Sequence, residues 1–361
     1  MYPQLRIDLA KLAKNLKILE DLAKKGACSL MIVTKSFCAD SGIIDMLLGS
    51  EYLDYLADSR IENLESYADK ARMSGKETVL LRLPQHCEIE QTIRWADISL
   101  NSDIDTLRLL DEEAGRQNKT HKVILMIDMG DLREGVFFRD EEEIFELCGE
   151  ILKMQNVKLE GLGVNLSCYG AIMPKADNLG HFCEIAEKIE KKFSIKLPII
   201  SGGNSSSIYL ISRDELPAKI NNLRLGESFI LGRETAYGGL IPGAFGDAIQ
   251  LRAQIIELKD KPSVPIGEVG MDAFGNVPEY EDRGIISRAI LAVGKQDTDP
   301  DGLTPLNTKA EILGASSDHL LMDASGCGYK PGDTVDFSLD YSALLKLFTS
   351  KYVKRVYINE E

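Results

Sequence analysis

The chain has 361 residues, 44% of them hydrophobic and 27% charged, which is enough for a full hydrophobic core and two domains. Its formal net charge of −15 argues against nucleic acid or an anionic membrane as a partner. Seven cysteines without a paired spacing and four scattered histidines indicate neither a disulfide framework nor a metal site. No apolar run is long enough to span a bilayer and no leader opens the chain, so we expect a cytoplasmic protein.

The first two thirds of the chain alternate short buried strands with amphipathic helices. After an extended start at 5–8, eight strands are predicted at 30–33, 52–57, 78–83, 98–101, 123–128, 159–166, 198–201 and 223–230. Helical stretches separate most of them, for example 103–117, 141–154 and 175–192, and Asp40 caps a further helix that Gly49 ends. Strict alternation predicts a parallel sheet, and eight units predict closure into a (β/α)8 TIM-type barrel.

From about residue 243 the sequence pattern changes. Glycine and proline become more frequent, and short β-like runs follow one another at 249–258, 285–293, 309–313, 319–323 and 334–337. Only 341–348 has a helical pattern in this part. We therefore predict an α/β barrel domain over 1–242 and a C-terminal, mostly-β domain over 243–361.

A lysine stands at the C-terminal end of the first buried strand. Lys35 follows the apolar run 30–33, where desolvation can lower the pKa of its amine enough for it to form an imine. Taken alone, a lysine at a strand end is more often one that extends into water. The residues at the other strand ends therefore decide between the two interpretations.

Arginines and a glycine- and serine-rich loop follow the other predicted strands, at the end where a parallel barrel collects its active site. Arg133 lies in DMGDLREG after the fifth strand, GGNSSS at 202–207 follows the seventh, and Arg224 and Gly226 lie in the eighth. Glycines let backbone N–H groups approach an anion, and serine hydroxyls complete a phosphate cradle. The simplest ligand for lysine, cradle and arginines together is pyridoxal 5'-phosphate, with its aldehyde carried as an imine by Lys35.

These segments resemble the pyridoxal-phosphate racemases of the alanine racemase fold (fold-type III), specifically the ornithine/alanine racemase branch. VTKSFCAD resembles the imine-lysine motif, DMGDLREG the TGMxRxG segment, GGNSSS the NSA motif, LRLGE the RPG motif and LDYSALL the SYE segment. The resemblance implies that Lys35 carries the cofactor, that Arg133 lies near the cofactor oxygen and the substrate carboxylate, and that Arg224 faces the pyridine nitrogen. The other cofactor-site residues that it implies are Asn165, where alanine racemases place a histidine, Asn204, Glu227, and the phosphate-binding Ser205, Gly226 and Tyr341.

The resemblance implies an isomerase that interconverts L and D amino acids through an external aldimine, by two-base transfer of the α-proton. Arg224 favours this reaction, because a guanidinium stays charged and cannot protonate the ring nitrogen, which weakens the cofactor as an electron sink. Ornithine is the first substrate that the branch implies, with alanine, serine or lysine as alternatives. A decarboxylase or aldolase on the same fold, or a cofactor homeostasis protein, is less favoured. The resemblance also implies a homodimer with the active site at its interface.

The proton donor on the face opposite Lys35 stays open. The family draws a tyrosine from the segment that opens the β domain, but here that segment, PIGEVGMDAFG at 265–275, contains none. It offers Glu268, which aligns best, and Asp272, and a carboxyl group can act there if burial raises its pKa. The alternative donors are Tyr280, Cys327 and water.

A basic substrate also needs a partner for its distal ammonium group. Glu227, Asp272 and Asp318 are the candidates, while Arg133 is expected to bind the substrate carboxylate. One carboxylate contact is enough to discriminate strongly, because a smaller substrate such as alanine would leave that carboxylate unpaired.

Overall fold

The computed structural model describes residues 1–271, 274–275 and 277–358. The chain forms two compact units, one comprising residues Ala10–Gly246 and the other comprising Met1–Leu9 together with Asp247–Glu361. No helix among the described residues is long and apolar enough to cross a membrane. The first unit is called the barrel unit below, and the second the β unit.

The barrel unit is built on eight parallel strands that close on themselves, as the sequence predicts. Each strand pairs in parallel with the next, and β10 pairs with β2 to complete the ring. A short ninth strand, β7 (Val136–Phe137), pairs only with the end of β6. The eight barrel strands are β2 (Ser29–Val33), β3 (Tyr55–Asp58), β4 (Glu77–Leu80), β5 (Ile98–Asn101), β6 (His121–Asp128), β8 (Val157–Val164), β9 (Ile199–Ser201) and β10 (Asn222–Leu225).

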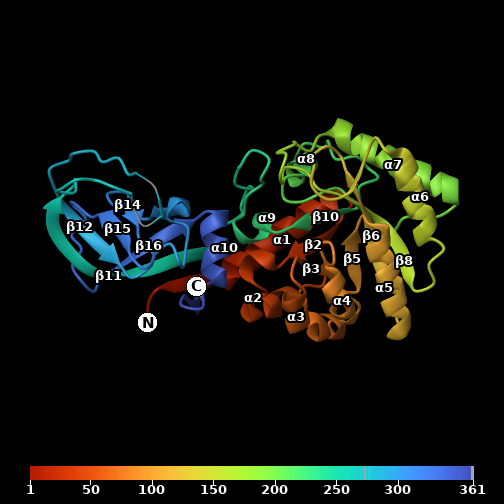
Figure 1. Cartoon of the computed structure of the whole chain (residues 1–361), viewed down its shortest axis with the longest axis horizontal. Helices are drawn as coiled ribbons and strands as arrows, with labels where there is room; N and C mark the ends of the chain where they lie inside the picture. Colours follow the sequence, from red (N-terminus) through yellow and green to blue (C-terminus); the bar gives the residue numbers. More distant parts are fainter. Residues whose placement is uncertain (272–273, 276, 359–361) are drawn as a thin grey trace. The chain divides into compact units, whose positions relative to one another are not determined.

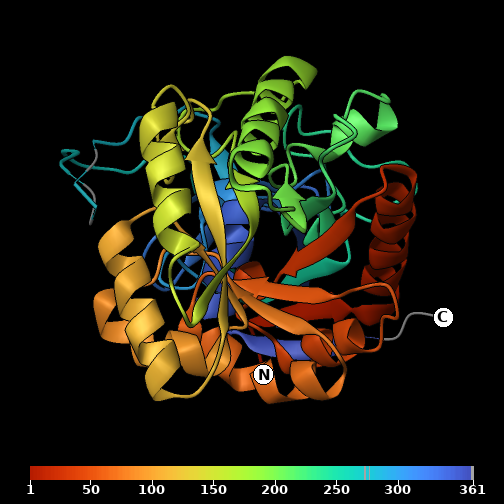
Figure 2. The ribbon, with the colours of Figure 1, turned by 90° about the vertical axis from the view of Figure 1, so that its right-hand side faces the viewer.

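Helices surround these strands, which is visible in the barrel unit in Figures 1 and 2. Asp40, Asp103 and Asp140 each cap a helix by accepting a hydrogen bond from a backbone N–H of its first turn. The helices are α1 (Leu9–Lys25), α2 (Ser41–Leu48), α3 (Ile61–Met73), α4 (Ile89–Trp95), α5 (Ile104–Arg116), α6 (Glu141–Ile151), α7 (Ala176–Phe193), α8 (Ile208–Ser212) and α9 (Glu227–Ile230), with short 3-10 turns at η1 (Lys35–Phe37) and η2 (His86–Glu88).

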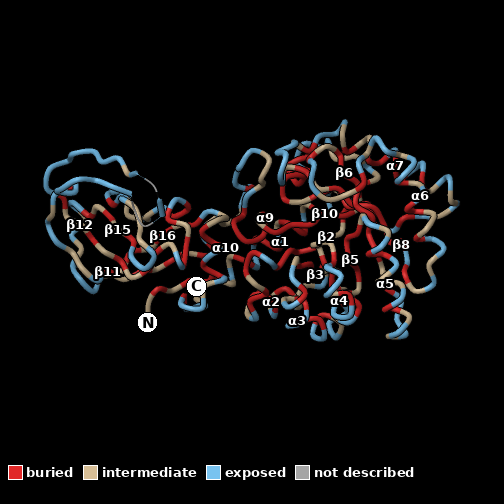
Figure 3. The backbone as a smooth tube through the Cα atoms, in the orientation of Figure 1, coloured by how far each residue is buried: buried red, intermediate tan, exposed pale blue. Residues whose placement is uncertain are grey.

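The barrel interior is filled by alternate residues of successive strands. Because helices cover the outside and side chains fill the inside, the strands are buried on both faces, and Figure 3 shows them as a continuous buried region. Gly163 of β8 makes room in this interior, since a Cβ there would lie 2.7 Å from the sulfur of Met126. The interior cluster comprises Met31, Val33, Ala57, Val79, Ile98, Leu100, Ile124, Met126 and Ile199.

The eighth barrel strand is shorter than the predicted range 223–230. It ends at Leu225, and the following residues from Glu227 form the short helix α9. The apolar run that includes Phe229 and Ile230 suits either a buried strand or a buried helix, so its composition does not distinguish them. A contact distant in the sequence selects the helix, because the Ser205 hydroxyl accepts a hydrogen bond from the backbone N–H of Ser228 at 3.1 Å.

The β unit is an eight-stranded sheet with one helix, α10 (Tyr341–Thr349), and a 3-10 turn, η3 (Pro300–Gly302), among its described residues. Its main strand order is β13-β16-β11-β12-β15-β14, and β1 lies beside β11 and β17. The mostly-β character predicted for this part is confirmed. The strands are β1 (Gln4–Asp8), β11 (Ile249–Pro262), β12 (Ile285–Leu291), β13 (Leu303–Pro305), β14 (Glu311–Ala315), β15 (Leu320–Asp323), β16 (Thr334–Leu339) and β17 (Lys354–Ile358).

The first residues of the chain belong to this β unit, whereas the sequence-based limits of 1–242 placed them with the barrel. β1 pairs antiparallel with β11 and parallel with β17. Both partners lie more than two hundred residues away, for example Leu5 beside Leu251 and Arg355. A local hydrophobic pattern carries no information about such a distant partner, so the extended start was recognisable but its sheet was not.

Candidate active site

Lys35 begins the turn η1 directly after β2, so its side chain starts at the carboxyl end of a barrel strand. A buried polar network fixes the preceding residue, Thr34. Its hydroxyl donates to Asp58 at 2.5 Å and lies 3.2 Å from the hydroxyl of Tyr67. Asp58, at the end of β3, also accepts from the backbone N–H of Arg60 at 2.8 Å. The backbone that carries Lys35 is therefore tied to the neighbouring strand.

The charge on Lys35 is disfavoured by its surroundings. The residue keeps exposed surface, but the protein around its amine reduces hydration, and this desolvation lowers the pKa of Lys35. The positive charge of Arg133 lowers that pKa further, while the interactions with Cys168, Asp58 and Glu134 oppose the shift. A lowered pKa increases the fraction of neutral amine, the form that acts as a nucleophile or a base.

Arg224 of β10 is a buried cation whose hydrogen-bond partners among the described residues are neutral groups. Its guanidinium donates to the Ser201 hydroxyl at 2.5 Å, to the Val164 carbonyl at 2.7 Å and to the Asn165 side-chain oxygen at 2.6 Å. Desolvation lowers the pKa of Arg224 to about 10, so the group stays protonated at neutral pH. The barrel thus holds one positive charge in a fixed place at the carboxyl ends of β8, β9 and β10.

A carboxylate links Arg133 to this buried cation. Glu134 forms an ion pair with Arg133 and accepts a hydrogen bond from the side-chain amide of Asn165. Desolvation lowers the pKa of Arg133, but the hydrogen bond and charge of Glu134 outweigh it and leave that pKa raised. The predicted residues Arg133, Asn165 and Arg224 therefore lie in one connected group.

The loop 202–207 and the start of α9 form the candidate anion cradle. The buried Ser205 hydroxyl accepts from the Ser228 N–H, so its own proton remains available to an anion. Among the described residues, the hydroxyl of Ser228 is buried without a hydrogen-bond partner. Gly226 precedes α9 at a point where a Cβ would lie 3.3 Å from the Cβ of Val33, so glycine lets this turn approach β2 closely.

Asn204 has structural bonds at both ends of its side-chain amide. Its nitrogen donates to the Leu166 carbonyl at 2.9 Å and to the Cys168 sulfur at 3.3 Å, while its oxygen accepts from the Ser206 N–H at 2.8 Å. These bonds fix the loop beside the end of β8. A direct contact of Asn204 with the cofactor stays a prediction, as does one of Glu227, the first residue of α9.

The remaining predicted residues belong to the β unit. Tyr341 is the first residue of α10, Glu268 is an exposed residue in the segment before β12, and Asp318 is exposed beside Ser317, whose hydroxyl donates to it at 2.8 Å. Asp272 lies outside the described residues. The roles of these four residues stay predictions.

Sequence reasoning missed two members of the connected group, Glu134 and Ser201. Glu134 stands next to Arg133 in the DMGDLREG segment, and Ser201 is the last residue of β9. Their positions carried a signal, because each lies at a strand end or in the loop after one. What the spacing did not reveal is which of several nearby carboxylates turns toward Arg133.

Comparison with known proteins identifies the family. Residues 7–233 match the family described as alanine racemase, N-terminal domain. Over 357 residues, 98% of this chain and 99% of the relative, the sequence is 52% identical to the ornithine racemase of Acetoanaerobium sticklandii. The chain belongs to the alanine racemase family. A lysine racemase of Thermotoga maritima is 37% identical to this racemase, with 99% of each chain covered.

The fold of this racemase is also that of solved structures. An alanine racemase from Bartonella henselae with covalently bound pyridoxal phosphate matches with a TM-score of 0.71 and 16% identity, covering 99% of this chain and 100% of that one. This similarity supports the fold, a parallel barrel followed by a β domain. The named relatives confirm the prediction of an amino-acid racemase, and so of an isomerase.

Proposed function

We propose that this racemase acts on ornithine and uses pyridoxal 5'-phosphate held at the carboxyl end of its barrel. The observation that carries the substrate is the 52% identity to an ornithine racemase over 98% of the chain. The cofactor rests on the arrangement of the site: an amine of lowered pKa at Lys35 and a fixed, buried cation at Arg224.

The donor set of the barrel unit fits this cofactor. Ser205 has a hydroxyl proton to give, and the buried hydroxyl of Ser228, which has no partner in the part of the chain that the structure describes, stands in the first turn of α9. Ser205 and Gly226 would hold the phosphate, and we propose Tyr341 as a third ligand. Arg224 would face the ring nitrogen, and Arg133 the ring oxygen and the substrate carboxylate.

The reaction needs a base and a fixed charge pattern at the α-carbon. When bound, the cofactor withdraws electrons from the α-carbon and makes its proton acidic. Lys35 would remove or return that proton on one face, and its lowered pKa favours the neutral form that does so. Arg224 stays charged and would give no proton to the ring, which limits electron withdrawal and disfavours side reactions. Inversion then requires a second proton donor on the opposite face.

We assign that second donor to Glu268, with Asp272 as the next candidate. Both stand in the sequence between β11 and β12 of the β unit, and the resemblance to the family places the second acid in this segment. The same resemblance underlies our proposal of a homodimer with the active site at the interface. For the distal ammonium of ornithine, the candidate carboxylates are Glu227, Asp272 and Asp318.

A panel of single enantiomers tests the substrate. Ornithine, lysine, alanine and serine, each as pure L and pure D forms, are incubated with the enzyme, and inversion is followed by chiral chromatography while released carbon dioxide is measured. We expect inversion without carbon dioxide, and a kcat/KM for ornithine about 100-fold or more above that for alanine, because alanine leaves a carboxylate unpaired. Similar kcat/KM values for alanine and ornithine would contradict the ornithine preference but would still agree with racemase activity.

The second proton donor is tested in heavy water. Glu268→Gln and Asp272→Asn are made separately, and each enantiomer is followed for α-deuterium uptake and inversion. Loss of the true donor should stop inversion while Lys35 still exchanges the α-proton of one enantiomer with retention. If Glu268→Gln racemises in both directions at the wild-type rate, the donor is another residue.

A further inference from the structure

Glu134 lies in a loop whose backbone is fixed on both sides. Before it, the Asp128 carboxylate accepts from the backbone N–H groups of Gly130 at 2.9 Å and Leu132 at 3.1 Å. After it, Gly135 has a φ of +127°, and a Cβ there would lie 2.6 Å from the Asp128 nitrogen. Only glycine fits this approach, which brings β7 back against β6. The position of Glu134 is thus set by the loop.

The side chain of Glu134 is largely enclosed and uses both of its oxygens. It is 15% exposed, against 42% for its partner Arg133. One oxygen forms an ion pair with Nε of Arg133, and the other accepts from Nη2 of Arg133 and from Nδ2 of Asn165. Such a two-point contact fixes the plane of the guanidinium as well as its place.

Asn165 carries this contact on to the second arginine. A carboxylate only accepts hydrogen bonds and a guanidinium only donates them, so the amide must turn its NH2 to Glu134 and its oxygen to Arg224. That oxygen accepts from Arg224 at 2.6 Å. The result is a continuous series, Arg133–Glu134–Asn165–Arg224, from the exposed arginine to the buried one.

We propose that Glu134 is a positioning residue, which holds the Arg133 guanidinium in the orientation that receives the substrate carboxylate. Through Asn165, Glu134 also fixes the position of Arg133 relative to Arg224. This inference rests on the proposed function, because the role of Arg133 toward the carboxylate belongs to it. Without Glu134, the long and half-exposed Arg133 side chain would sample several rotamers. Substrate binding would then have to select one of them, which raises KM more than it lowers kcat.

The kinetic test compares two Glu→Gln changes in the holoenzyme. Glu134→Gln keeps the side-chain shape and removes the charge, and Glu112→Gln on α5 is the matched control, since that exposed carboxylate pairs with Arg116 at 3.5 Å. We expect Glu134→Gln to raise KM about 10-fold or more, with a smaller fall in kcat and a cofactor dissociation constant within about 3-fold of wild type. Glu134→Asp should restore part of the loss, and Glu112→Gln should behave as wild type.

A second measurement does not depend on cofactor or turnover. The full chain is treated with phenylglyoxal, and the rate of modification of each arginine is read by peptide mass spectrometry. Arg133 should react about 3-fold faster or more in Glu134→Gln, whereas Arg116 should change little in Glu112→Gln. Unchanged labelling of Arg133, or a wild-type KM in Glu134→Gln, would overturn the proposal. If the wild-type protein racemises no amino acid, the proposed function is overturned. The labelling rates would still show whether Glu134 restricts the Arg133 side chain.

The link through Asn165 is tested by a double-mutant cycle. If the series acts as one unit, Asn165→Ala and Glu134→Gln together should raise KM by clearly less than the product of the single effects. Independent effects, which multiply, would overturn the connection to Arg224.

Discussion

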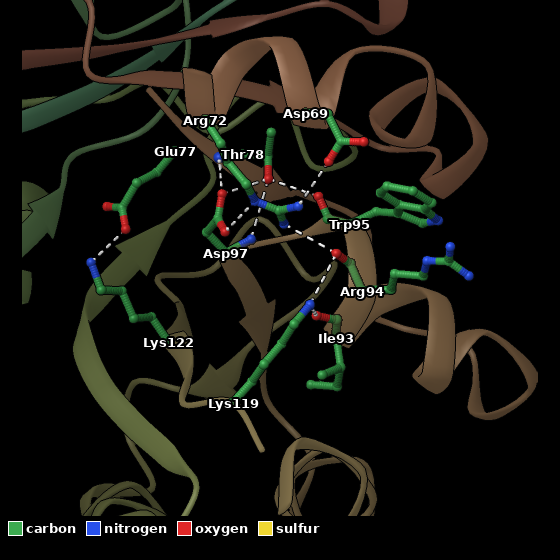
Figure 4. A network of polar contacts seen from close by, with 10 residues as sticks. All are labelled: Asp69, Arg72, Glu77, Thr78, Ile93, Arg94, Trp95, Asp97, Lys119 and Lys122. Atoms are coloured by element: carbon green, nitrogen blue, oxygen red, sulfur yellow. Dashed lines mark hydrogen bonds and ion pairs between the residues drawn. The ribbon is translucent and has the colours of Figure 1, made fainter. Parts of the chain in front are cut away.

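The two ends of the barrel use charged residues in different ways. At the amino-terminal ends of the strands, Figure 4 shows charged side chains that contact an opposite charge or backbone carbonyl groups. Asp97 accepts from Arg72 at 3.1 Å and from the backbone and hydroxyl of Thr78 at 2.8 and 2.9 Å. Lys122 pairs with Glu77 at 2.6 Å, and Lys119 donates to two backbone carbonyls at 2.9 and 3.2 Å.

At the carboxyl ends, charge is held in place without being fully neutralised. Arg224 is buried and its partners among the described residues are neutral, whereas Lys119, whose pKa desolvation also lowers, is exposed; the Ser228 hydroxyl is buried without a partner among the described residues. Unbalanced charge costs stability, so it persists where a ligand compensates for it. The difference supports our proposal that the carboxyl end binds and reacts, as in other barrels of this type, while the amino-terminal end stabilises the barrel.

The largest expected difference between the two ends is the change in kcat/KM when one lysine is removed from each end. Lys35→Ala should lower kcat/KM about 10⁴-fold or more, the upper end of what a general base supplies, with little change in unfolding temperature. Lys119→Ala should leave kcat/KM within about 2-fold and cost roughly 1 kcal/mol of stability, the usual value of a hydrogen bond. Borohydride reduction of the holoenzyme identifies the cofactor lysine by peptide mass. An adduct on a lysine other than Lys35 would refute the assignment.

Asp97→Ala gives the converse result at the amino-terminal end. It removes the acceptor of three hydrogen bonds, one of them from a guanidinium, and should destabilise the chain by about 2 to 3 kcal/mol in urea or thermal unfolding. Activity per folded molecule should stay at the wild-type value. Asp97→Asn, which keeps one acceptor oxygen, should show an intermediate loss. A fall in kcat/KM without a fall in stability would show that the amino-terminal end takes part in function.

Much of the barrel was predictable because its information is local. The helix that Asp40 caps begins and ends as expected, and strand 98–101 is reproduced residue for residue, since buried runs and caps act over a few positions. The β7 pairing, the helix after Gly226 and the pairing of β1 depend on partners that the local pattern does not contain. The short strands β13 and β17 were likewise not predicted.

The sequence predicted the positions of the site residues that a motif names. It predicted fewer of the residues that contact those motif residues. Lys35, Arg133 and Arg224 stand at strand ends, where topology alone gathers side chains. The bonds of Glu134 and Asn204 depend on loop conformation, including the left-handed backbone at Leu132 (φ 57°), which spacing does not encode.

The smallest expected effect distinguishes two serines of one loop. Ser205 keeps a hydroxyl proton for an anion, whereas the Ser207 hydroxyl donates to the Gly202 carbonyl at 2.8 Å. Ser205→Ala should weaken cofactor binding by roughly 10- to 100-fold, since a charge-assisted hydrogen bond contributes about 1.5–3 kcal/mol. Ser207→Ala should cost about 1 kcal/mol of stability and leave the dissociation constant within about 3-fold. Both constants come from titrating the cofactor-free full chain with pyridoxal 5'-phosphate and following absorbance. If both variants weaken cofactor binding equally, the conformation of the loop determines cofactor affinity, and not the Ser205 hydroxyl. The two ends of the barrel would then differ as a whole, but single serines of this loop could not be divided into binding and stabilising residues.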